Sequence, residues 1–163
     1  MERLTVVGTA WTFGNNVDTD QITPSQYMHL STEEMSEYVF EPIAPGFAKE
    51  FKRGEIIVAG SNFGCGSSRE TAPDALKFLG TAAIVAESFG RIFFRNAIAI
   101  GLPVLVCPNV SKTAEKGDKF EIDFDAAEVR NLTKDRAYCA VPLNDMMLTS
   151  LKRGGIMKLL AEE

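Results

Sequence analysis

The chain has 163 residues, of which 45% are hydrophobic and 24% are charged, as is usual for a globular protein with a sizeable core. Its formal net charge of −5 at pH 7 argues against nucleic acid as the main partner, although a local basic patch could still bind anions. The N-terminus has no signal-peptide pattern, and no apolar run approaches the ~20 residues that a membrane helix needs. We therefore expect residues 1–163 to form a single domain in the cytoplasm, away from membranes.

The first part of the chain predicts few regular elements. A capping-box pattern, Ser-Thr-Glu-Glu at residues 31–34, predicts the start of a short helix, and two prolines at positions 42 and 45 follow it. In chain order we expect a strand at residues 4–13, a polar loop at 15–20, the capped helix from 31 to about 40, and a buried strand at 55–59.

The later part of the chain alternates apolar runs with helical patterns. Gly80 and Gly101 follow two of the helical patterns, where glycine is typical of a helix end. We expect a helix ending near residue 79, a strand at 82–86, a helix at 91–100, a strand at 104–106, a hairpin of strands 118–124 and 128–132, a strand at 136–141, and a closing helix at 144–153.

This order of elements predicts an α/β fold with a mixed sheet and flanking helices. Short apolar strands that alternate with helices are typical of a buried parallel sheet, and the later hairpin adds antiparallel strands. A plain doubly wound nucleotide-binding fold is disfavoured, because the first third of the chain has little strand–helix–strand rhythm.

Cysteine and histidine are too few and too scattered to predict a metal site in this chain. Cys65, Cys107 and Cys139 show no Cys-x-x-Cys spacing, and His29 is the only histidine. We therefore expect neither structural zinc nor an iron–sulfur cluster on this chain. Cys107 and Cys139 lie in apolar runs and are expected to be core residues.

Residues 60–70, Gly-Ser-Asn-Phe-Gly-Cys-Gly-Ser-Ser-Arg-Glu, are the strongest candidate for a functional site. Glycines allow the backbone to approach a ligand, and the two hydroxyls and the guanidinium that follow suit a carboxylate. The segment lacks the third glycine of a dinucleotide fingerprint and the lysine of a P-loop. A Ser-His-Asp hydrolase would have to use His29 alone.

A structural interpretation of the same residues stays open. Ser67 and Glu70 have the spacing of a capping box, in which Ser67 would cap the next helix. Pro73 would interrupt a helix that began at Ser68, so the helix either starts at Thr71 or kinks there.

Three motifs in order resemble the aconitase superfamily. Residues 66–70, Gly-Ser-Ser-Arg-Glu, are similar to that family's signature, and residues 16–24 are similar to its opening loop. Residues 87–97 are similar to its Ser-Phe-Ala-Arg-Ile-Phe-x-Arg-Asn block, with Gly90 where alanine is usual. Over nearly the whole chain, length and spacing resemble the free-standing small subunits of isopropylmalate isomerase and homoaconitase.

The resemblance implies a swivelling β/β/α domain, like the C-terminal domain of aconitase, that closes over a large subunit. That large subunit would carry a [4Fe-4S] cluster as Lewis acid, and the reaction would be dehydration and rehydration of a hydroxy acid. By the same resemblance, Ser67 would be the catalytic base, acting as an alkoxide, while Ser68 and Arg69 would bind a substrate carboxylate.

Four further residues are expected to support the loop. These are the glycines Gly64 and Gly66, together with Asp18 and Asp20, whose carboxylates are expected to shape the opening loop by bonding to its backbone. A salt bridge from Arg69 to Asp18 or Asp20 is the structural alternative to substrate binding.

Tyr27, Met28, His29 and Leu30 fall where the resembled family has its substrate-specificity segment. There, arginine in the third position goes with an extra substrate carboxylate, and an apolar residue goes with isopropylmalate. His29 in that position counts against a tricarboxylate, and Met28 with Leu30 suits an alkyl group. His29 is open to three interpretations: a polar tip on an apolar wall when neutral, a weak attraction for an anion when protonated, or an exposed loop residue.

Two hypotheses follow. In the first, the chain is the small subunit of a heterodimeric or heterotetrameric hydro-lyase, which isomerises 2-/3-isopropylmalate in leucine biosynthesis; homoaconitase and methylmalate or dimethylmalate dehydratases are its related alternatives. In the second, the chain is a non-catalytic binding module of the same fold.

Arg91 and Arg95, one helical turn apart, are expected to be surface charges, interface charges or charges that support the site.

Overall fold

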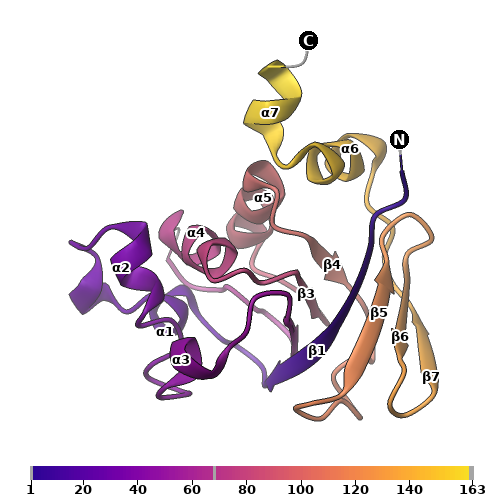
Figure 1. The fold of residues 1–163 in the computed structure, drawn as a ribbon, viewed down its shortest axis with the longest axis horizontal. Coiled ribbons are helices and arrows are strands. Elements are labelled where there is room, and N and C mark those ends of the chain that lie inside the picture. Colours follow the sequence, from indigo (N-terminus) through magenta and orange to yellow (C-terminus); the bar gives the residue numbers. More distant parts are fainter. Residues whose placement is uncertain (1, 68, 162–163) are drawn as a thin grey trace.

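A computed structural model describes residues 2–67 and 69–161, which form a curled, mixed sheet of seven strands with helices packed against it (Figure 1). The strands run in the order β4-β3-β2-β1-β5-β6-β7. Their bounds are β1 (Thr5–Phe13), β2 (Ile56–Ala59), β3 (Ala83–Ala86), β4 (Val104–Val106), β5 (Lys119–Asp123), β6 (Glu128–Asn131) and β7 (Arg136–Cys139).

The helices lie mostly between β1 and β4 and after β7. The bounds are α1 (Thr19–Ile22), the 3₁₀ turn η1 (Ser25–Tyr27), α2 (Thr32–Ser36), α3 (Phe47–Glu50), α4 (Thr71–Phe78), α5 (Arg91–Ile100), α6 (Asp145–Arg153) and α7 (Ile156–Ala161). Throughout the described ranges, every helix is too short or too polar to span a bilayer.

Strand β1 joins two halves of the sheet that differ in direction. Its first part, residues 5–9, pairs antiparallel with β5, and its last part, residues 10–13, pairs parallel with β2. The parallel half continues to β3 and β4, and the antiparallel half continues to β6 and β7. The predicted mixed α/β sheet is therefore confirmed.

The parallel half contains the most buried strands. All residues of β2 (Ile-Ile-Val-Ala) and β3 (Ala-Ile-Val-Ala) are buried, as expected of strands covered on both faces. Helix α4 connects β2 to β3 and packs against α2 and α5 (Figure 1). Because these strands are parallel, their carboxyl ends and the loops that follow them lie at one edge of the sheet.

An aromatic cluster covers part of β1. Trp11 and Phe13 on this strand pack against Phe47, with ring centroids 4.8 and 5.8 Å away, and Phe13 stacks on Phe40 at 4.2 Å. Phe40 also lies 6.2 Å from Phe63, the residue that precedes Gly64. The cluster thus extends from the core to the loop of greatest functional interest.

Two local predictions from the sequence are wrong. Ser67 and Glu70 do not form a capping box: α4 begins at Thr71, which confirms the alternative start predicted there, and its N-cap, Glu70, makes no side-chain capping bond. Pro73 then lies in the first turn, where its missing N–H leaves no bond unmade. Cys139 is exposed on β7, an edge strand, whereas Cys107 is buried, and burial raises the pKa of its thiol to about 12.

Candidate active site

Three loops that are distant in sequence meet at the carboxyl edge of the parallel strands. The Gly64 amide donates to the Val17 carbonyl at 2.7 Å, and the Thr19 amide donates to the Cys65 carbonyl at 2.9 Å. On the other side, the Gly90 amide donates to the Phe63 carbonyl at 2.9 Å. The three motifs that carry the family resemblance therefore form one structure.

Glycine is required where these loops touch. Gly64 has φ +79°, and a Cβ there would lie 2.3 Å from Cγ of Phe93. Gly66 has φ +91°, and a Cβ there would lie 3.3 Å from Cβ of Asp18. Both positions combine a left-handed backbone with a close approach.

Gly90 makes the third close approach. A Cβ at Gly90 would lie 2.6 Å from the Gly64 carbonyl oxygen, so alanine, usual at this place in the resembled family, would require the loop to shift. The departure of this chain from the family pattern at Gly90 thus accompanies a tight contact with the glycine loop.

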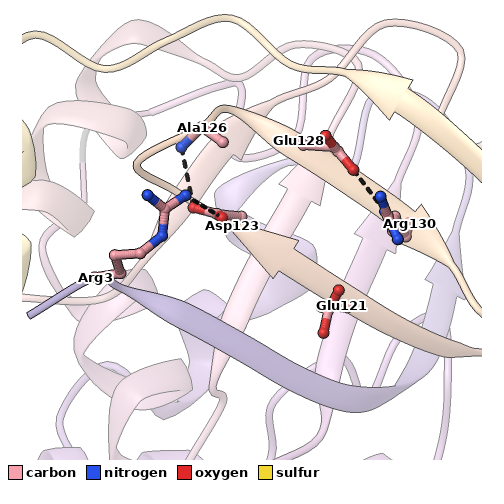
Figure 2. Close-up of a pocket in the computed structure, with 6 residues that line it drawn as sticks. All are labelled: Arg3, Glu121, Asp123, Ala126, Glu128 and Arg130. Atoms are coloured by element: carbon pink, nitrogen blue, oxygen red, sulfur yellow. Dashed lines mark hydrogen bonds and ion pairs between the residues drawn. The ribbon is translucent and has the colours of Figure 1, made fainter.

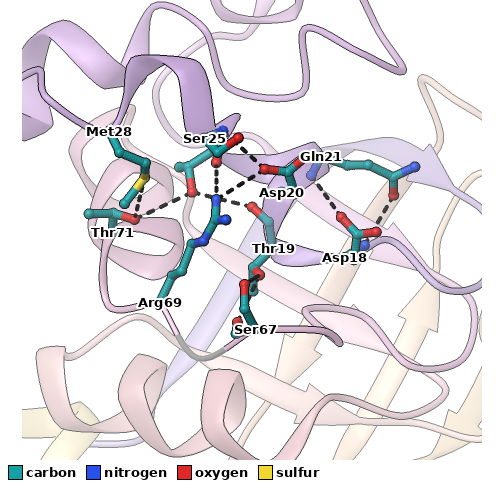
Figure 3. Close-up of polar contacts among 10 residues, drawn as sticks. Asp18, Thr19, Asp20, Gln21, Ser25, Met28, Ser67, Arg69 and Thr71 are labelled. Atoms are coloured by element: carbon teal, nitrogen blue, oxygen red, sulfur yellow. Dashed lines mark hydrogen bonds and ion pairs between the residues drawn. The ribbon is translucent and has the colours of Figure 1, made fainter.

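Ser67 lies at the end of this loop, exposed and beside a second hydroxyl (Figure 3). The hydroxyl of Thr19 donates to the Ser67 carbonyl at 2.8 Å, and the two side-chain oxygens lie 3.3 Å apart. Because Thr19 has one hydroxyl proton and gives it to the carbonyl, Ser67 Oγ is the donor in the second contact. Ser68, the neighbouring residue predicted to bind substrate, lies outside the described residues.

Thr19 was not among the residues that the sequence singled out. It lies between two aspartates in a segment predicted to be an irregular polar loop, and only the pairing of residues 18 and 65 brings it beside Ser67. Its position within the opening-loop motif was the one available signal.

Arg69 is anchored through one nitrogen (Figure 3). Its Nη1 donates to Asp20 Oδ1 at 3.1 Å and to the Thr23 carbonyl at 3.0 Å, and only 20% of the side chain is exposed. The salt bridge considered from the sequence is therefore present, with Asp20 rather than Asp18. Within the described part of the chain, Nε and Nη2 have no bonded partner, which leaves the donors on one edge of the guanidinium for a carboxylate.

The two aspartates bond to the backbone of the opening loop. Asp18 accepts from the Gln21 amide at 2.9 Å and caps α1, while Gln21 accepts from the Asp18 amide at 3.0 Å. Asp20 accepts from the Ser25 amide at 3.0 Å, and this bond together with Arg69 lowers the pKa of Asp20. This geometry is that of loop-shaping side chains; their role in a functional site stays a prediction.

The predicted specificity segment begins beside the start of α4. Met28 Sδ accepts from the Thr71 hydroxyl at 3.6 Å, two residues after Arg69 (Figure 3). Tyr27 stacks on Tyr38 with centroids 3.9 Å apart, which fixes the segment from the other side. His29 is exposed, and Leu30 is half-buried.

A separate hollow of about 340 Å³ lies on the antiparallel half of the sheet (Figure 2). Four of its charged side chains form two ion pairs, Arg3 with Asp123 at 2.5 Å and Arg130 with Glu128 at 2.5 Å, and Glu121 leaves the lining with one net negative charge. The bond from Arg3 also lowers the pKa of Asp123. This hollow contains none of the residues that the sequence proposed for chemistry.

The described residues do not fit an iron–sulfur cluster. In residues 2–67 and 69–161, no three side chains of the His, Cys, Asp or Glu type come together as metal ligands would. Cys65 is half-buried, Cys107 is buried and Cys139 is exposed. The polar groups that the described residues bring to this site are hydroxyls, backbone amides, two carboxylates and a guanidinium.

Comparison with known proteins gives consistent matches. Residues 12–109 match the family described as the aconitase C-terminal domain. The chain is 47% identical to a 3-isopropylmalate dehydratase small subunit from Methanosarcina acetivorans, over 93% of both chains. It is 50% identical to the methanogen homoaconitase small subunit of Methanothermobacter thermautotrophicus, over 92% of this chain and 87% of that one.

A solved structure is similar over almost the whole length. The crystal structure of 3-isopropylmalate dehydratase from Methanocaldococcus jannaschii superimposes with a TM-score of 0.91 and 37% sequence identity. The match covers 98% of this chain and 95% of that chain. Fold and sequence thus point to the same group of proteins.

Proposed function

The chain belongs to the aconitase C-terminal domain family, and from this we propose that it is the small subunit of a hydro-lyase that isomerises an alkyl-substituted malate by dehydration and rehydration. Its partner is a large subunit that carries a [4Fe-4S] cluster, and the two form a cytoplasmic heteromer. Residues 1–163 act as one swivelling domain that closes over the partner.

The strongest support is the arrangement of Ser67 and Arg69. Ser67 presents an exposed hydroxyl, and Arg69 presents Nε and Nη2 of its guanidinium, which are unbonded within the described residues. Both residues follow the same glycine loop. A proton donor or acceptor next to a carboxylate clamp is what elimination beside a carboxylate requires. The Lewis-acid chemistry that the family implies for the departing hydroxyl belongs to the partner.

Arg69 orients the substrate. Its contacts with Asp20 and Thr23 occupy Nη1, so a substrate carboxylate binds in bidentate fashion to Nε and Nη2. Ser68 adds a hydroxyl to the same carboxylate. The negative charge of Asp20 lies on the far side of the guanidinium and holds it in place.

Ser67 transfers the proton. As an alkoxide, its Oγ takes the proton from the carbon next to the bound carboxylate, and it returns a proton to carbon during rehydration. For Ser67 to act as a base, the Thr19 hydroxyl turns its proton from the Ser67 carbonyl toward Oγ, a rotation that the 3.3 Å separation permits. Thr19 then stabilises the alkoxide by donation.

The substrate class rests on residues 27–30 rather than on overall identity. The relatives named for 3-isopropylmalate dehydratase and for homoaconitase match this chain almost equally well, at 47% and 50% identity. In this segment, Met28 is near α4 and no arginine is available for a third carboxylate. We therefore assign 3-isopropylmalate, or a similar alkylmalate, ahead of homocitrate.

The test is reconstitution with the cluster-bearing large subunit from the same organism. Absorbance of the alkene intermediate is followed with 3-isopropylmalate, citramalate and homocitrate as separate substrates. The proposal expects turnover only when both chains are present, with 3-isopropylmalate or citramalate preferred. Equal rates with and without this chain would refute a catalytic role, and a preference for homocitrate would overturn the substrate assignment.

A further inference from the structure

Helix α5 presents two arginines and an isoleucine to solvent beside the candidate site. Arg91, Ile92 and Arg95 are exposed, and 47% of Ile92 remains accessible. The opposite side of the helix is buried through Phe93 and Ala97. The exposed residues are therefore not needed to attach α5 to the core.

The two charges are poorly placed for the isolated chain. Arg91 occupies the first position of α5, where the helix dipole disfavours a cation, and the first turn contains no acidic residue. Arg91 and Arg95 are also four residues apart, a spacing at which like charges repel. Within the folded chain, neither the helix dipole nor the spacing of the two residues favours positive charge at these positions.

Neither arginine has a carboxylate partner within residues 2–67 and 69–161. Arg3, Arg69 and Arg130 each form an ion pair, whereas Arg53 and Arg136 form none among the described residues, so it is the place of Arg91 and Arg95 on α5 that distinguishes them. The chain as a whole is not short of carboxylates, since it has 22 acidic residues against 17 basic ones, but no carboxylate of the described residues pairs with Arg91 or Arg95. An acidic surface on another molecule would supply what α5 lacks.

The position of α5 beside the glycine loop indicates which partner would carry this acidic surface. Helix α5 begins directly after Gly90, which packs closely against the backbone of Gly64 and Cys65, and Phe93 fills the space over Gly64. The loop held in this way ends in Ser67. A protein that closes over Ser67 therefore meets the first turns of α5 at the same time.

We propose that Arg91, Ile92 and Arg95 form a docking surface for an acidic patch on the large subunit. The inference rests on the proposed function, because it takes the large subunit as the partner. Arginines with an apolar side chain between them are typical of the energetically important part of an interface. Charge attraction at this surface speeds association and sets the direction from which the partner approaches Ser67.

The experiment measures binding of the purified large subunit to Arg91→Glu and Arg95→Glu without substrate. Arg136→Glu is the matched control, because Arg136 is exposed on β7 and gives the same change of charge. Each α5 variant is expected to raise Kd about tenfold or more, mainly through slower association, while the control stays within about twofold. Added salt should weaken wild-type binding more than variant binding.

A thermal unfolding measurement on the free chain separates docking from folding. Arg91→Glu removes a cation from a helix N-terminus, so its Tm is expected to equal or exceed that of the wild type. A loss of Tm that accompanies weaker binding would overturn the proposal in favour of a structural role. Kd values equal to the control would overturn it directly.

Two further outcomes would also contradict the proposal. Unchanged Kd with a raised KM would make these arginines substrate contacts, and loss of self-association in the variants with unchanged Kd would assign the surface to a second copy of this chain. Since binding is measured without turnover, an inactive wild-type complex would count against the proposed reaction while leaving the docking result intact.

Discussion

The guanidinium of Arg69 is bonded through Nη1 and, among the described residues, is free at the edge formed by Nε and Nη2. From the sequence, a salt bridge within the chain and the binding of a substrate carboxylate were alternative roles for this side chain. The bonds to Asp20 and Thr23 show that a structural ion pair exists. They do not occupy Nε or Nη2, so the ion pair leaves Arg69 able to bind a carboxylate as proposed. The salt bridge of Arg69 therefore does not exclude substrate binding by the same side chain.

Replacing Arg69 with lysine tests this arrangement. Arg69→Lys keeps the charge but has no planar fork, so it cannot hold the anchor and a bidentate carboxylate together. We expect kcat/KM to fall about 10- to 100-fold, the effect of losing one charged hydrogen bond. Steady-state kinetics of the assembled enzyme measure this fall in kcat/KM, and Arg136→Lys is the control. An unchanged KM in Arg69→Lys would rule out contact between Arg69 and the substrate.

His29 offers a test of specificity that should leave folding unaffected. The side chain is exposed, so arginine can replace it without a change in packing. His29→Arg is expected to raise the ratio of kcat/KM for homocitrate over 3-isopropylmalate about tenfold, because a third carboxylate gains a cationic partner. Competition between the two substrates measures the ratio, and His29→Gln controls for loss of the imidazole. A constant ratio would remove this segment from the account of specificity.

At this scale the sequence predicted the residues of the motifs but not all of their contacts. Ser67 and Arg69 were singled out because they follow a glycine loop, and their proposed roles, which came from the family resemblance, stay predictions. Thr19 was not, because its contact with Ser67 depends on a pairing between segments 48 residues apart. Cys139 was wrongly assigned to the core, since an apolar run on an edge strand does not reveal which of its residues face solvent.

At the scale of elements, the glycine loop depends on the helix beneath it. Gly64→Ala is expected to destabilise the chain by about 2–5 kcal/mol, from a left-handed backbone penalty and overpacking against Phe93. Gly117→Ala is the matched control, with φ +97° and no atom within 4 Å of the added Cβ, and should lose only about 1–2 kcal/mol. Urea unfolding measures both; equal losses would show that contact with α5 contributes nothing.

The antiparallel half is held by a buried carboxylate. Asp118 accepts from Asn131 Nδ2 and Lys134 Nζ, each at 2.9 Å, and from the Glu115 amide at 3.0 Å. Burial alone would raise its pKa, but these bonds outweigh burial and lower the pKa. The carboxylate thus connects the start of β5 to the turn after β6.

This depressed pKa predicts how stability depends on pH. The contribution of Asp118 is present above the unfolded-state pKa of about 4 and is lost as pH falls through the lower folded-state pKa. Asp118→Asn should be less stable by about 1–3 kcal/mol at pH 7, and the difference from wild type should shrink below about pH 4. Urea unfolding between pH 2.5 and 7 measures it; a difference independent of pH in that range would contradict the assignment.

Long elements with clear end signals were predictable, and short ones were not. Residues 91–100 were predicted without error, because Gly101 gives a clear end signal after a helical pattern. The helices α1, α3 and α7 were missed, since they have only four to six residues and depend on tertiary contacts. The capping-box signal was correct at Ser31, where Glu34 bonds back, and wrong at Ser67, where the chain enters the loop contacts instead.

At the scale of the whole molecule, the sheet brings together at one edge the residues that we propose for catalysis and for docking of the partner. The parallel strands bring the three motifs to one edge, and the exposed start of α5 lies beside them. The division of β1 between two partners was not predictable, because its alternating residues do not specify which strands pair with each part. The resulting surface carries Ser67, the proposed base, and Arg69, the proposed carboxylate clamp, and the described residues show no group of three or more His, Cys, Asp or Glu side chains that could hold a metal ion.

The most direct test of this account is the Ser67→Ala variant in complex with the large subunit. Because Ser67 is exposed and its side chain contacts only Thr19 within the described residues, removal of the hydroxyl should leave folding and assembly intact. We predict a fall in kcat of about 10²–10⁴-fold, as expected for loss of a general base, with Kd for the large subunit within about twofold of wild type. A variant that binds normally and turns over at the wild-type rate would contradict the assignment of Ser67 as the base that this chain supplies.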